Sequence, residues 1–587
     1  MISVATITES RLVGCVFACF LVACAWAQGQ KAQASASPSK IAYEKGLAAL
    51  HKADLPSARS NLEKAIQLSP SNAEAHEWLG WVLGRQGDLD SAVRELRAAV
   101  KLKPGLADAH VTLASILIQQ GNPAEAENEA RAAVKAAPTN AEAHRILGRT
   151  LSLMNLKDEG VSELRQAVKL APQRADLHDD LGSALAQQGH YDQAVLAFKE
   201  ALRLLPAFSF AHFHLGVAYL QQKQLEDAIL ELRKAIEIAP QDAASHYYLS
   251  QALAAESNSA DALKELQTTT ELKPDWFDAQ IALGLASQRA GDANAAVAAF
   301  AQAVKLRSND PEAHNDLGLA LIQKGDAESS IPEFRKATEL RPEDALFRGN
   351  LGIAFMQRAD FDSAITELNA AIQTTPSNAS LHYNLGLAYK LKDDLDHAVT
   401  ELQNAIQLEP TLADAHYTLG VLFWQRGEFD KAVEQLRGAI DARHDYTEAY
   451  YTLGTVQKQQ GKLQDALASL REAIRLQPTF APAHTTLASV LRQTGDTEGA
   501  AAEAKLATQL TGPGNNLQAA IIATNSGVRL LTAGDLDGAI SQFRTAIQNN
   551  DKYAPAHLHL AEALQRQGNK ASADAEFKRA SELDPHK

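Results

Sequence analysis

Cysteine is almost absent from this 587-residue chain, and its three copies, Cys15, Cys19 and Cys24, all lie close to the N-terminus. After removal of a leader the chain would keep no cysteine, or a single lipid-modified one, so a disulfide framework and a thiolate metal site are both excluded. Aromatic residues make up only 6% of the chain, and a basic surface is missing because the net charge is −15. Nucleic acid is therefore not expected as a partner. The abundance of Ala, Leu, Gln, Glu and Lys favours helix over sheet.

An uncharged run from Leu12 to Ala27 follows Arg11 near the N-terminus. It is short for a membrane-spanning helix, which needs about 20 apolar residues. Small residues at its end form a cleavage pattern before Gln28, which predicts a signal peptide over residues 1–27. The sequence thus predicts an exported protein that is periplasmic or secreted.

A second pattern overlaps the first. Leu21 to Cys24 resembles the lipobox of bacterial lipoproteins, in which the cysteine becomes the lipid-bearing first residue. In this alternative the signal ends at residue 23 and Cys24 anchors the protein in the cell envelope. An uncleaved signal anchor is a third possibility.

A period of 34 residues runs through the rest of the chain. With a recurrent glycine set at position 8, the sequence divides into sixteen repeats. Leu occupies position 7 in fourteen of them, Ala position 20 in fourteen, Ala position 27 in fifteen and Pro position 32 in twelve. Such self-similarity predicts a repeat architecture. The proline ladder shows it most clearly: Pro70, Pro104, Pro138, Pro172, Pro206, Pro240, Pro274, Pro342, Pro376, Pro410 and Pro478.

Each repeat reads as a helical hairpin. It holds two apolar periodic stretches of about fourteen residues, separated by turn residues such as Gly87 and Asp88. Proline at position 32 cannot continue a helix and closes the second one. A glycine in mid-helix costs about 1 kcal/mol relative to alanine, so its recurrence predicts a close approach by a neighbouring helix. One hairpin cannot bury its own apolar face, and stacked hairpins must supply the core.

This period and pattern resemble the tetratricopeptide repeat from Ser39 to Lys587. The resemblance implies an all-α, right-handed superhelical solenoid of about sixteen stacked helix-turn-helix repeats without catalytic activity. We expect a flexible tether over residues 28–38, fourteen repeats over 39–514, an insertion or hinge over 515–519, and two more repeats over 520–587.

Histidine is the residue most often used for proton transfer and metal binding, and here it recurs at position 4 of eleven repeats. A catalytic residue is needed once per site, with partners of other kinds around it. The histidines are therefore predicted to be structural, packed between helices. Acidic residues at position 2 are predicted to complement the helix dipole. No metal or phosphate-binding motif is found, and no cofactor is expected. The histidines are His76, His110, His144, His178, His212, His246, His314, His382, His416, His484 and His557.

In the family that this sequence resembles, positions 2, 5, 6, 9, 12 and 13 of the first helices line a concave groove. Aromatic residues at these positions suit the recognition of proteins or extended peptides, because they bury a large area at small entropic cost. Arg145 and Arg149 form a basic spot that could receive a carboxylate. The alternative function is a subunit of an envelope export or polysaccharide-assembly complex. The remaining groove candidates are Trp78, Trp81, Phe213, Tyr247, Tyr248, Tyr383, Asn384, Tyr417, Trp424 and Tyr451.

Overall fold

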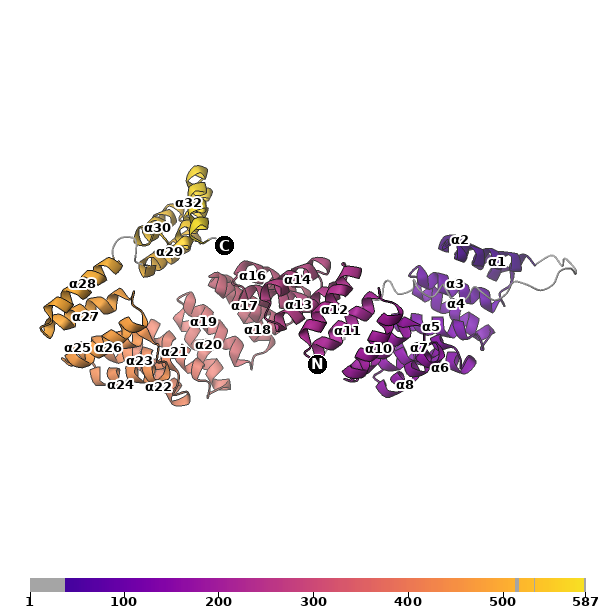
Figure 1. The fold of residues 1–587 in the computed structure, drawn as a ribbon, viewed down its shortest axis with the longest axis horizontal. Coiled ribbons are helices and arrows are strands. Elements are labelled where there is room, and N and C mark those ends of the chain that lie inside the picture. The colour runs from indigo at the N-terminus through magenta and orange to yellow at the C-terminus, as the bar shows by residue number, and fades with distance from the viewer. Residues whose placement is uncertain (1–36, 512–516, 533, 585–587) are drawn as a thin grey trace. The chain divides into compact units, whose positions relative to one another are not determined.

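The computed structural model describes residues 37–511, 517–532 and 534–584, and every regular element within them is an α-helix. Thirty-two helices follow one another, and each odd-numbered helix packs against the even-numbered helix that follows it (Figure 1). The predicted all-α array of about sixteen helix-turn-helix repeats is confirmed. None of the described helices has the length and hydrophobicity needed to cross a bilayer.

Contacts between helices divide the chain into two units, with the boundary between Pro274 and Asp275. The 34-residue period continues across this boundary, although Ser308 replaces the next proline of the ladder, and the sequence pattern did not predict the division. The helices of the N-terminal unit are α1 Pro38–His51, α2 Leu55–Leu68, α3 Ala73–Arg85, α4 Leu89–Leu102, α5 Ala107–Gln119, α6 Pro123–Ala136, α7 Ala141–Leu153, α8 Lys157–Leu170, α9 Ala175–Gln187, α10 Tyr191–Leu204, α11 Ser209–Gln221, α12 Leu225–Ile238, α13 Ala243–Ala255 and α14 Ser259–Leu272.

The C-terminal unit continues the same alternation of helices. Its helices are α15 Phe277–Arg289, α16 Ala293–Leu306, α17 Pro311–Lys324, α18 Ala327–Leu340, α19 Ala345–Gln357, α20 Phe361–Thr374, α21 Ala379–Leu391, α22 Leu395–Leu408, α23 Ala413–Gln425, α24 Phe429–Ala442, α25 Thr447–Gln459, α26 Leu463–Leu476, α27 Ala481–Gln493, α28 Thr497–Thr511, α29 Leu517–Thr532, α30 Leu536–Asn549, α31 Ala554–Arg566 and α32 Lys570–Leu583.

Several predicted segments lie outside the described residues: the signal peptide with Cys24, the tether up to residue 36, and residues 515 and 516 of the insertion. Two residues assigned to the tether belong to the first helix instead, because Ser37 caps α1 and Pro38 is its first residue. Residues 517–519 of the predicted insertion form the first turn of α29. Whether the insertion acts as a hinge stays a prediction.

The turn between the two helices of a repeat uses a left-handed backbone at position 15. All sixteen repeats have a positive φ there; ten of these residues are glycine, such as Gly87 at 84°, and six are not, such as Lys223 at 60°. An aspartate often follows and caps the second helix, as Asp88 does by accepting a hydrogen bond from the backbone N–H of Ser91 at 3.2 Å. Local sequence thus fixes where each second helix begins.

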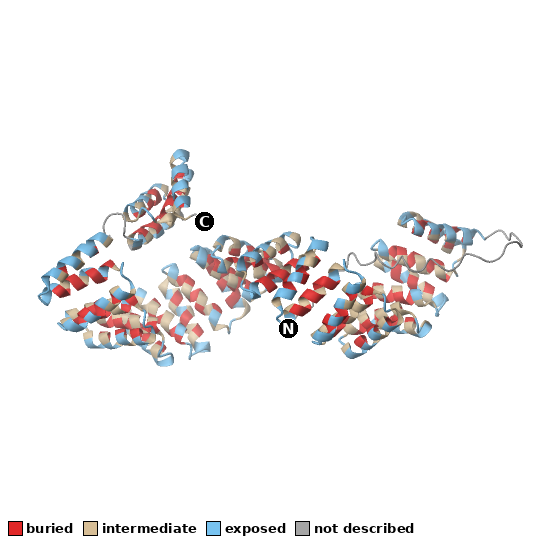
Figure 2. Cartoon of the chain, in the orientation of Figure 1, coloured by how far each residue is buried: buried red, intermediate tan, exposed pale blue. Residues whose placement is uncertain are grey.

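The core lies between the paired helices, where Figure 2 shows the buried residues concentrated. The position-8 glycine of the first helix faces the large residue at position 24 of the second. A Cβ atom placed on Gly182 would stand 2.5 Å from Cε1 of Phe198, a ring that is only 1% exposed. The close approach predicted from the recurrent glycine is therefore confirmed.

Candidate functional site

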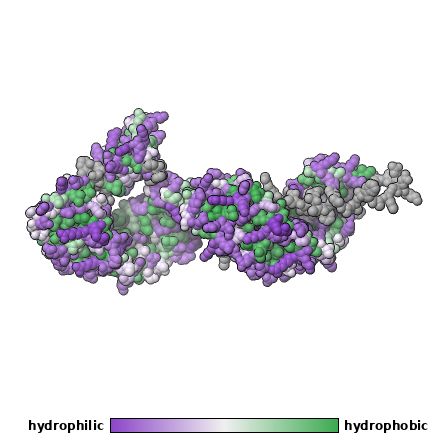
Figure 3. Space-filling view, in the orientation of Figure 1, coloured by the Kyte–Doolittle hydropathy of each residue, from purple (hydrophilic) through white to green (hydrophobic). Residues whose placement is uncertain are grey.

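Within each of the two units, the surface formed by positions 2, 5, 6, 9, 12 and 13 of the odd-numbered helices is called the A-helix face. Of the twelve candidate residues on it, eleven are partly exposed and Phe213 is buried. Seven lie in the N-terminal unit and five in the C-terminal unit. Hydrophilic and hydrophobic side chains are interspersed over the surface in Figure 3.

An aromatic pair marks α3. The rings of Trp78 and Trp81 meet edge to face with their centroids 6.2 Å apart, and the guanidinium of Arg85 stands 5.8 Å from the Trp81 ring centroid. Glu77 precedes the pair. Its burial, together with the nearby charge of Asp108, raises the pKa of the Glu77 carboxyl to about 7. Both rings keep exposed surface that a partner could cover.

A second aromatic cluster joins α11 and α13. The centroid of the Tyr248 ring is 5.5 Å from that of Phe213 and 5.6 Å from that of Tyr247. Phe213 also packs on His214 and is only 7% exposed. It therefore contributes to packing and offers almost no surface to a ligand, whereas Tyr247 and Tyr248 stay partly exposed.

Arg145 and Arg149 form the predicted basic spot on α7, and Arg145 is already paired with carboxylates of the same chain. This guanidinium hydrogen-bonds Asp180 and lies 3.2 Å from Asp176, both on α9, and 3.1 Å from Glu142 on its own helix. Its side chain is only 11% exposed. Arg145 thus links two repeats through the chain's own carboxylates, whereas Arg149 remains partly exposed.

The C-terminal unit carries aromatic residues on α23 and α25. The Tyr417 ring lies 5.0 Å from that of Tyr446, and the Tyr451 ring lies 5.3 Å from that of Phe480. Trp424 donates its indole N–H over 2.7 Å to a glutamine side chain on α25. Each predicted aromatic residue is thus backed by another side chain and keeps one part of its surface accessible.

A pocket of about 510 Å³ opens on the same face between α19 and α21. Asn384 lies at its α21 side and Leu346, which is 62% exposed, at its α19 side. The neighbouring Tyr383 is half-buried, and burial raises the pKa of its hydroxyl. The pocket is lined by Arg341, Glu343, Asp344, Ala345, Leu346, Gly349, Asn350, Ile353, Thr374, Thr375, Asn378, Ser380, Leu381 and Asn384.

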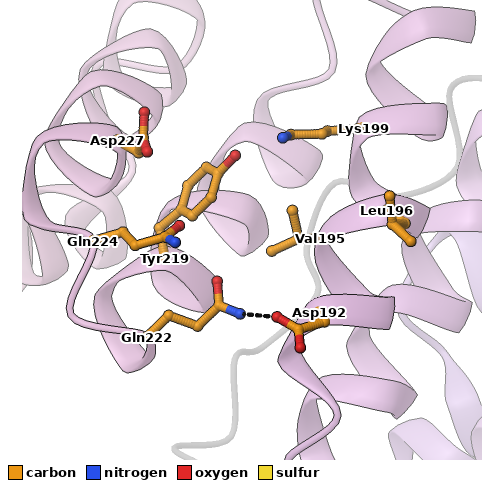
Figure 4. A pocket seen from close by; sticks show the side chains of 8 residues that line it. All are labelled: Asp192, Val195, Leu196, Lys199, Tyr219, Gln222, Gln224 and Asp227. Atoms are coloured by element: carbon orange, nitrogen blue, oxygen red, sulfur yellow. Dashed lines mark hydrogen bonds between the residues drawn. The ribbon is translucent and has the colours of Figure 1, made fainter.

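Another hollow of about 450 Å³ lies between α10 and the α11–α12 segment (Figure 4). Figure 4 shows the Tyr219 hydroxyl directed toward Lys199, whose ammonium lies 5.6 Å from the ring centroid. Gln222 donates a hydrogen bond to Asp192 over 2.7 Å. Four of the six polar residues that line this hollow are therefore paired with one another.

The recurrent histidines form a repeated polar bridge. In nine repeats Nδ1 lies 2.5–2.6 Å from a glutamate 19 residues ahead, on the second helix of the same repeat. Nε2 lies 2.9–3.1 Å from a backbone carbonyl six residues back, as His76 does with Pro70. Each bridge therefore ties together two helices and the preceding turn.

The structural role predicted for the histidines is thus supported, although they act through hydrogen bonds as well as packing. With a carboxylate on one side and a carbonyl on the other, only the doubly protonated ring can donate to both. The bond to Glu95 raises the pKa of His76, and the equivalent glutamates raise the pKa of His110 and His246. Within the described residues no cluster of His, Cys, Asp and Glu could hold a metal ion.

We expect the N-terminal unit to become more stable as the pH falls from 8 to 6. A raised histidine pKa in the folded state contributes stability that is complete below about pH 6.5 and is lost as pH rises through the folded-state pKa. Replacing Glu95 by glutamine should cost about 1–2 kcal/mol of local stability at pH 6 and much less at pH 8. Hydrogen exchange of α3 and α4 at both pH values, corrected for intrinsic rates, measures this.

The chain supplies its own control for that experiment. In the repeat of α23 and α24, His416 bonds Gln435 instead of a glutamate, at 2.8 Å. The protection of α23 and α24 from hydrogen exchange should depend less on pH than the protection of α3 and α4, the helices of the repeat that carries His76. Equal pH dependence in both repeats would show that the glutamate does not cause the effect.

The acids at position 2 do more than complement a helix dipole. Glu74 binds Lys103 at 2.7 Å, and Asp414 binds Arg443 at 2.8 Å, in each case a base 29 residues ahead. Sequence reasoning missed these pairs, the histidine–glutamate bridges and the pocket beside Gly349. The available signals were glutamate at position 23, bases at position 31, and the single glycine at position 5.

Three family models match the chain. One, described as tetratricopeptide repeat, matches residues 43–107, 180–243, 281–345 and 451–515. A second with the same description matches 83–150 and 530–587, and a third, described as TPR repeat, matches 354–393, 390–427 and 422–461. Together these matches cover well over half of the chain. No protein of curated function matches the sequence.

Solved structures with similar repeats include the APC/C hetero-tetramer Cut9–Hcn1, at 16% identity over 78% of this chain and 97% of that one, with a TM-score of 0.36. Yeast Tom70 is 16% identical over 72% of this chain and 96% of its own, with a TM-score of 0.31. YrrB, described as a TPR protein with an unusual peptide-binding site, is 23% identical over 31% of this chain and 95% of its own, with a TM-score of 0.27. At such TM-scores these likenesses carry no argument about function.

Proposed function

Because this chain belongs to the tetratricopeptide repeat family, whose members are non-catalytic scaffolds that bind proteins or peptides, we propose that it binds extended protein segments along its A-helix face in the cell envelope. The observation that carries the proposal is the set of partly exposed aromatic side chains on that face, each supported from behind by the fold. Anchors of this kind dominate binding energy in protein interfaces.

Support for the envelope location comes from the sequence alone. The uncharged run ending at Ala27 favours export, and the Leu21–Cys24 pattern favours a lipid anchor. The second candidate function, a subunit of an envelope export or polysaccharide-assembly complex, rests on that lipid. Metabolic labelling of Cys24 with a fatty acid distinguishes the two routes of processing.

Removing the aromatic anchors should abolish partner capture. In a crosslinking pull-down from the envelope fraction, we expect a variant with Trp78, Trp81, Tyr383, Tyr417 and Tyr451 changed to alanine to recover at least tenfold less partner than wild type. Tenfold corresponds to about 1.4 kcal/mol, less than one strong anchor contributes. Circular dichroism verifies that helix content is unchanged.

A matched control removes exposed apolar residues from the second helices. Leu196 on α10 is 68% exposed and Leu230 on α12 is 52% exposed. Changing both to alanine should leave capture unchanged. If this control loses the partner while the aromatic variant keeps it, the binding surface lies on the second helices and the proposal is wrong.

A further inference from the structure

The pocket between α19 and α21 exists because one side chain is missing. Position 5 carries a side chain in fifteen of the sixteen repeats, and in the repeat of α19 it is Gly349. A Cβ atom there would approach only the tip of Leu381, at 2.9 Å from Cδ2. The position-8 glycines, by contrast, face core side chains and their nearby backbone. Gly349 is therefore not required for packing of the paired helices, and its effect is to leave space on the A-helix face.

The walls of this space are apolar. Leu346 stands at position 2, where the repeats of α17 and α23 carry Glu312 and Asp414, and it is 62% exposed. Ile353 is partly exposed and Leu381 is buried. Leu346 therefore places exposed apolar surface beside the pocket, where a ligand side chain can cover it. The pocket thus suits one apolar side chain.

The edges of the pocket are polar. Asn350 donates its amide to Asn315 over 2.8 Å and keeps acceptor capacity, and in the described part of the chain Asn384 has no hydrogen-bond partner. A ligand lying over the pocket therefore meets amide groups on both sides. This suits an extended main chain better than a wholly apolar molecule.

The charge at the rim is negative. Arg341 is engaged by Glu312 at 2.6 Å and by Asp344 at 3.5 Å. Glu343 is exposed and makes no ion pair within the described residues. Because its charge is not compensated, a nearby cation on the ligand is favoured. A second copy of this chain, with a net charge of −15, is a poor occupant for the same reason.

We propose that this pocket binds one apolar side chain of an extended, basic segment of a partner protein, with Leu346, Ile353 and Leu381 around the side chain and Glu343 near a flanking lysine or arginine. In an extended segment residues two apart point to the same side, so a base two positions from the apolar residue can reach the rim. The inference rests on the proposed peptide-binding function and adds the chemistry of the partner.

The test uses the full chain and a fluorescent peptide, acetyl-Gly-Ser-Lys-Ser-X-Ser-Lys-Ser-Gly-amide, with photo-leucine at X. We expect its crosslinks to map to α19 and α21. Replacing Gly349 by leucine fills the space and should weaken binding measured by fluorescence anisotropy at least tenfold. Gly349→Ala should weaken binding of the peptide less than Gly349→Leu does, and it should leave the thermal unfolding temperature unchanged or raise it.

Two further variants keep the test decisive. Gly105→Ala is the control, since Gly105 lies in the turn between α4 and α5, outside the A-helix face, and a Cβ atom there would meet nothing within 4 Å. It should not alter binding. Glu343→Lys changes an exposed residue, so folding is preserved, and it should reverse the preference from the lysine peptide to its glutamate counterpart.

The outcomes separate this inference from the proposed function. Crosslinks confined to α23 and α25, insensitive to Gly349→Leu, would overturn the pocket assignment but leave the A-helix face as the binding surface. Crosslinks confined to the even-numbered helices would overturn both. Absence of binding by the lysine peptide, or binding unaffected by Glu343→Lys, overturns the basic partner proposed here.

Discussion

Replacing Gly182 by alanine is expected to destabilise the repeat of α9 and α10 by about 2–3 kcal/mol, as overpacking of a full core does. In an ordinary helix interior the same change stabilises by about 0.5–1 kcal/mol. The sign reverses here because the new methyl would stand 2.5 Å from Cε1 and 2.7 Å from Cδ1 of Phe198, a buried ring. Hydrogen exchange of α9 and α10 measures the local loss, which a whole-chain melt would average over many repeats.

The chain itself shows how this clash can be relieved. Two repeats have alanine at position 8, Ala114 and Ala488, and each has alanine at position 24 as well, Ala130 and Ala504. A third, Ala561, faces Phe577, which is partly exposed, unlike the fully buried rings at the same position elsewhere. In two of the three alanine repeats position 24 is therefore small as well, and in the third its ring is less deeply buried.

A double-mutant cycle tests that coupling. Phe198→Ala alone should cost about 3–5 kcal/mol through the cavity it leaves. On that background Gly182→Ala should cost almost nothing, because its methyl then has room. If Gly182→Ala is equally costly with and without the ring, contact with Phe198 is not the cause of the loss.

Periodicity in the sequence was enough to predict the helices and their closest approach. A helix such as α3 follows from its apolar spacing, its end from the turn glycine Gly87, and its packing distance from Gly80. These features depend on residues near in sequence or on the identity of one position. They are therefore visible without coordinates.

The candidate site was harder to predict, because it depends on which side chains bind or bury one another and are then no longer available to a ligand. His76 is at position 4 of its repeat and Glu95 at position 23, and their hydrogen bond becomes visible only once the two helices are paired in the structure. Phe213 and Arg145 occupy positions typical of a groove, yet one is buried against Tyr248 and the other is engaged by Asp180. The position of a residue in the repeat does not show whether its side chain is already engaged within the protein.

Arg145 provides the other large expected effect. Arg145 and Arg174 face three carboxylates on α7 and α9; Arg174 contacts Glu142 at 2.7 Å and Asp176 at 2.5 Å. Burial opposes the ionised form of Asp176, but the two guanidinium groups hold its pKa below the usual range. Replacing Arg145 by methionine should cost about 3–5 kcal/mol at pH 7, because it removes a nearly buried cation and leaves three partly buried carboxylates short of one.

The pH dependence of that loss identifies its cause. In the variant, the carboxylates near position 145 should have raised pKa values, so their penalty disappears as the pH falls through those values; in wild type the ion pairs lose their contribution only below the lowered pKa of Asp176. The difference in stability between wild type and Arg145→Met should therefore shrink toward pH 4. Adding Asp180→Asn to the Arg145→Met variant should restore part of its stability at pH 7. Arg203→Met, at an exposed pair with Glu200, should stay within error of wild type.

The same variants decide whether Arg145 also belongs to the binding surface. A structural ion pair predicts that capture of a partner falls only as far as stability falls, and that Arg145→Met combined with Asp180→Asn recovers both together. A ligand-binding arginine predicts that the second substitution restores stability while capture stays lost. Since Arg145 already contacts carboxylates on its own helix and on α9, we expect the first result, which would leave the aromatic residues and the Gly349 pocket as the binding surface.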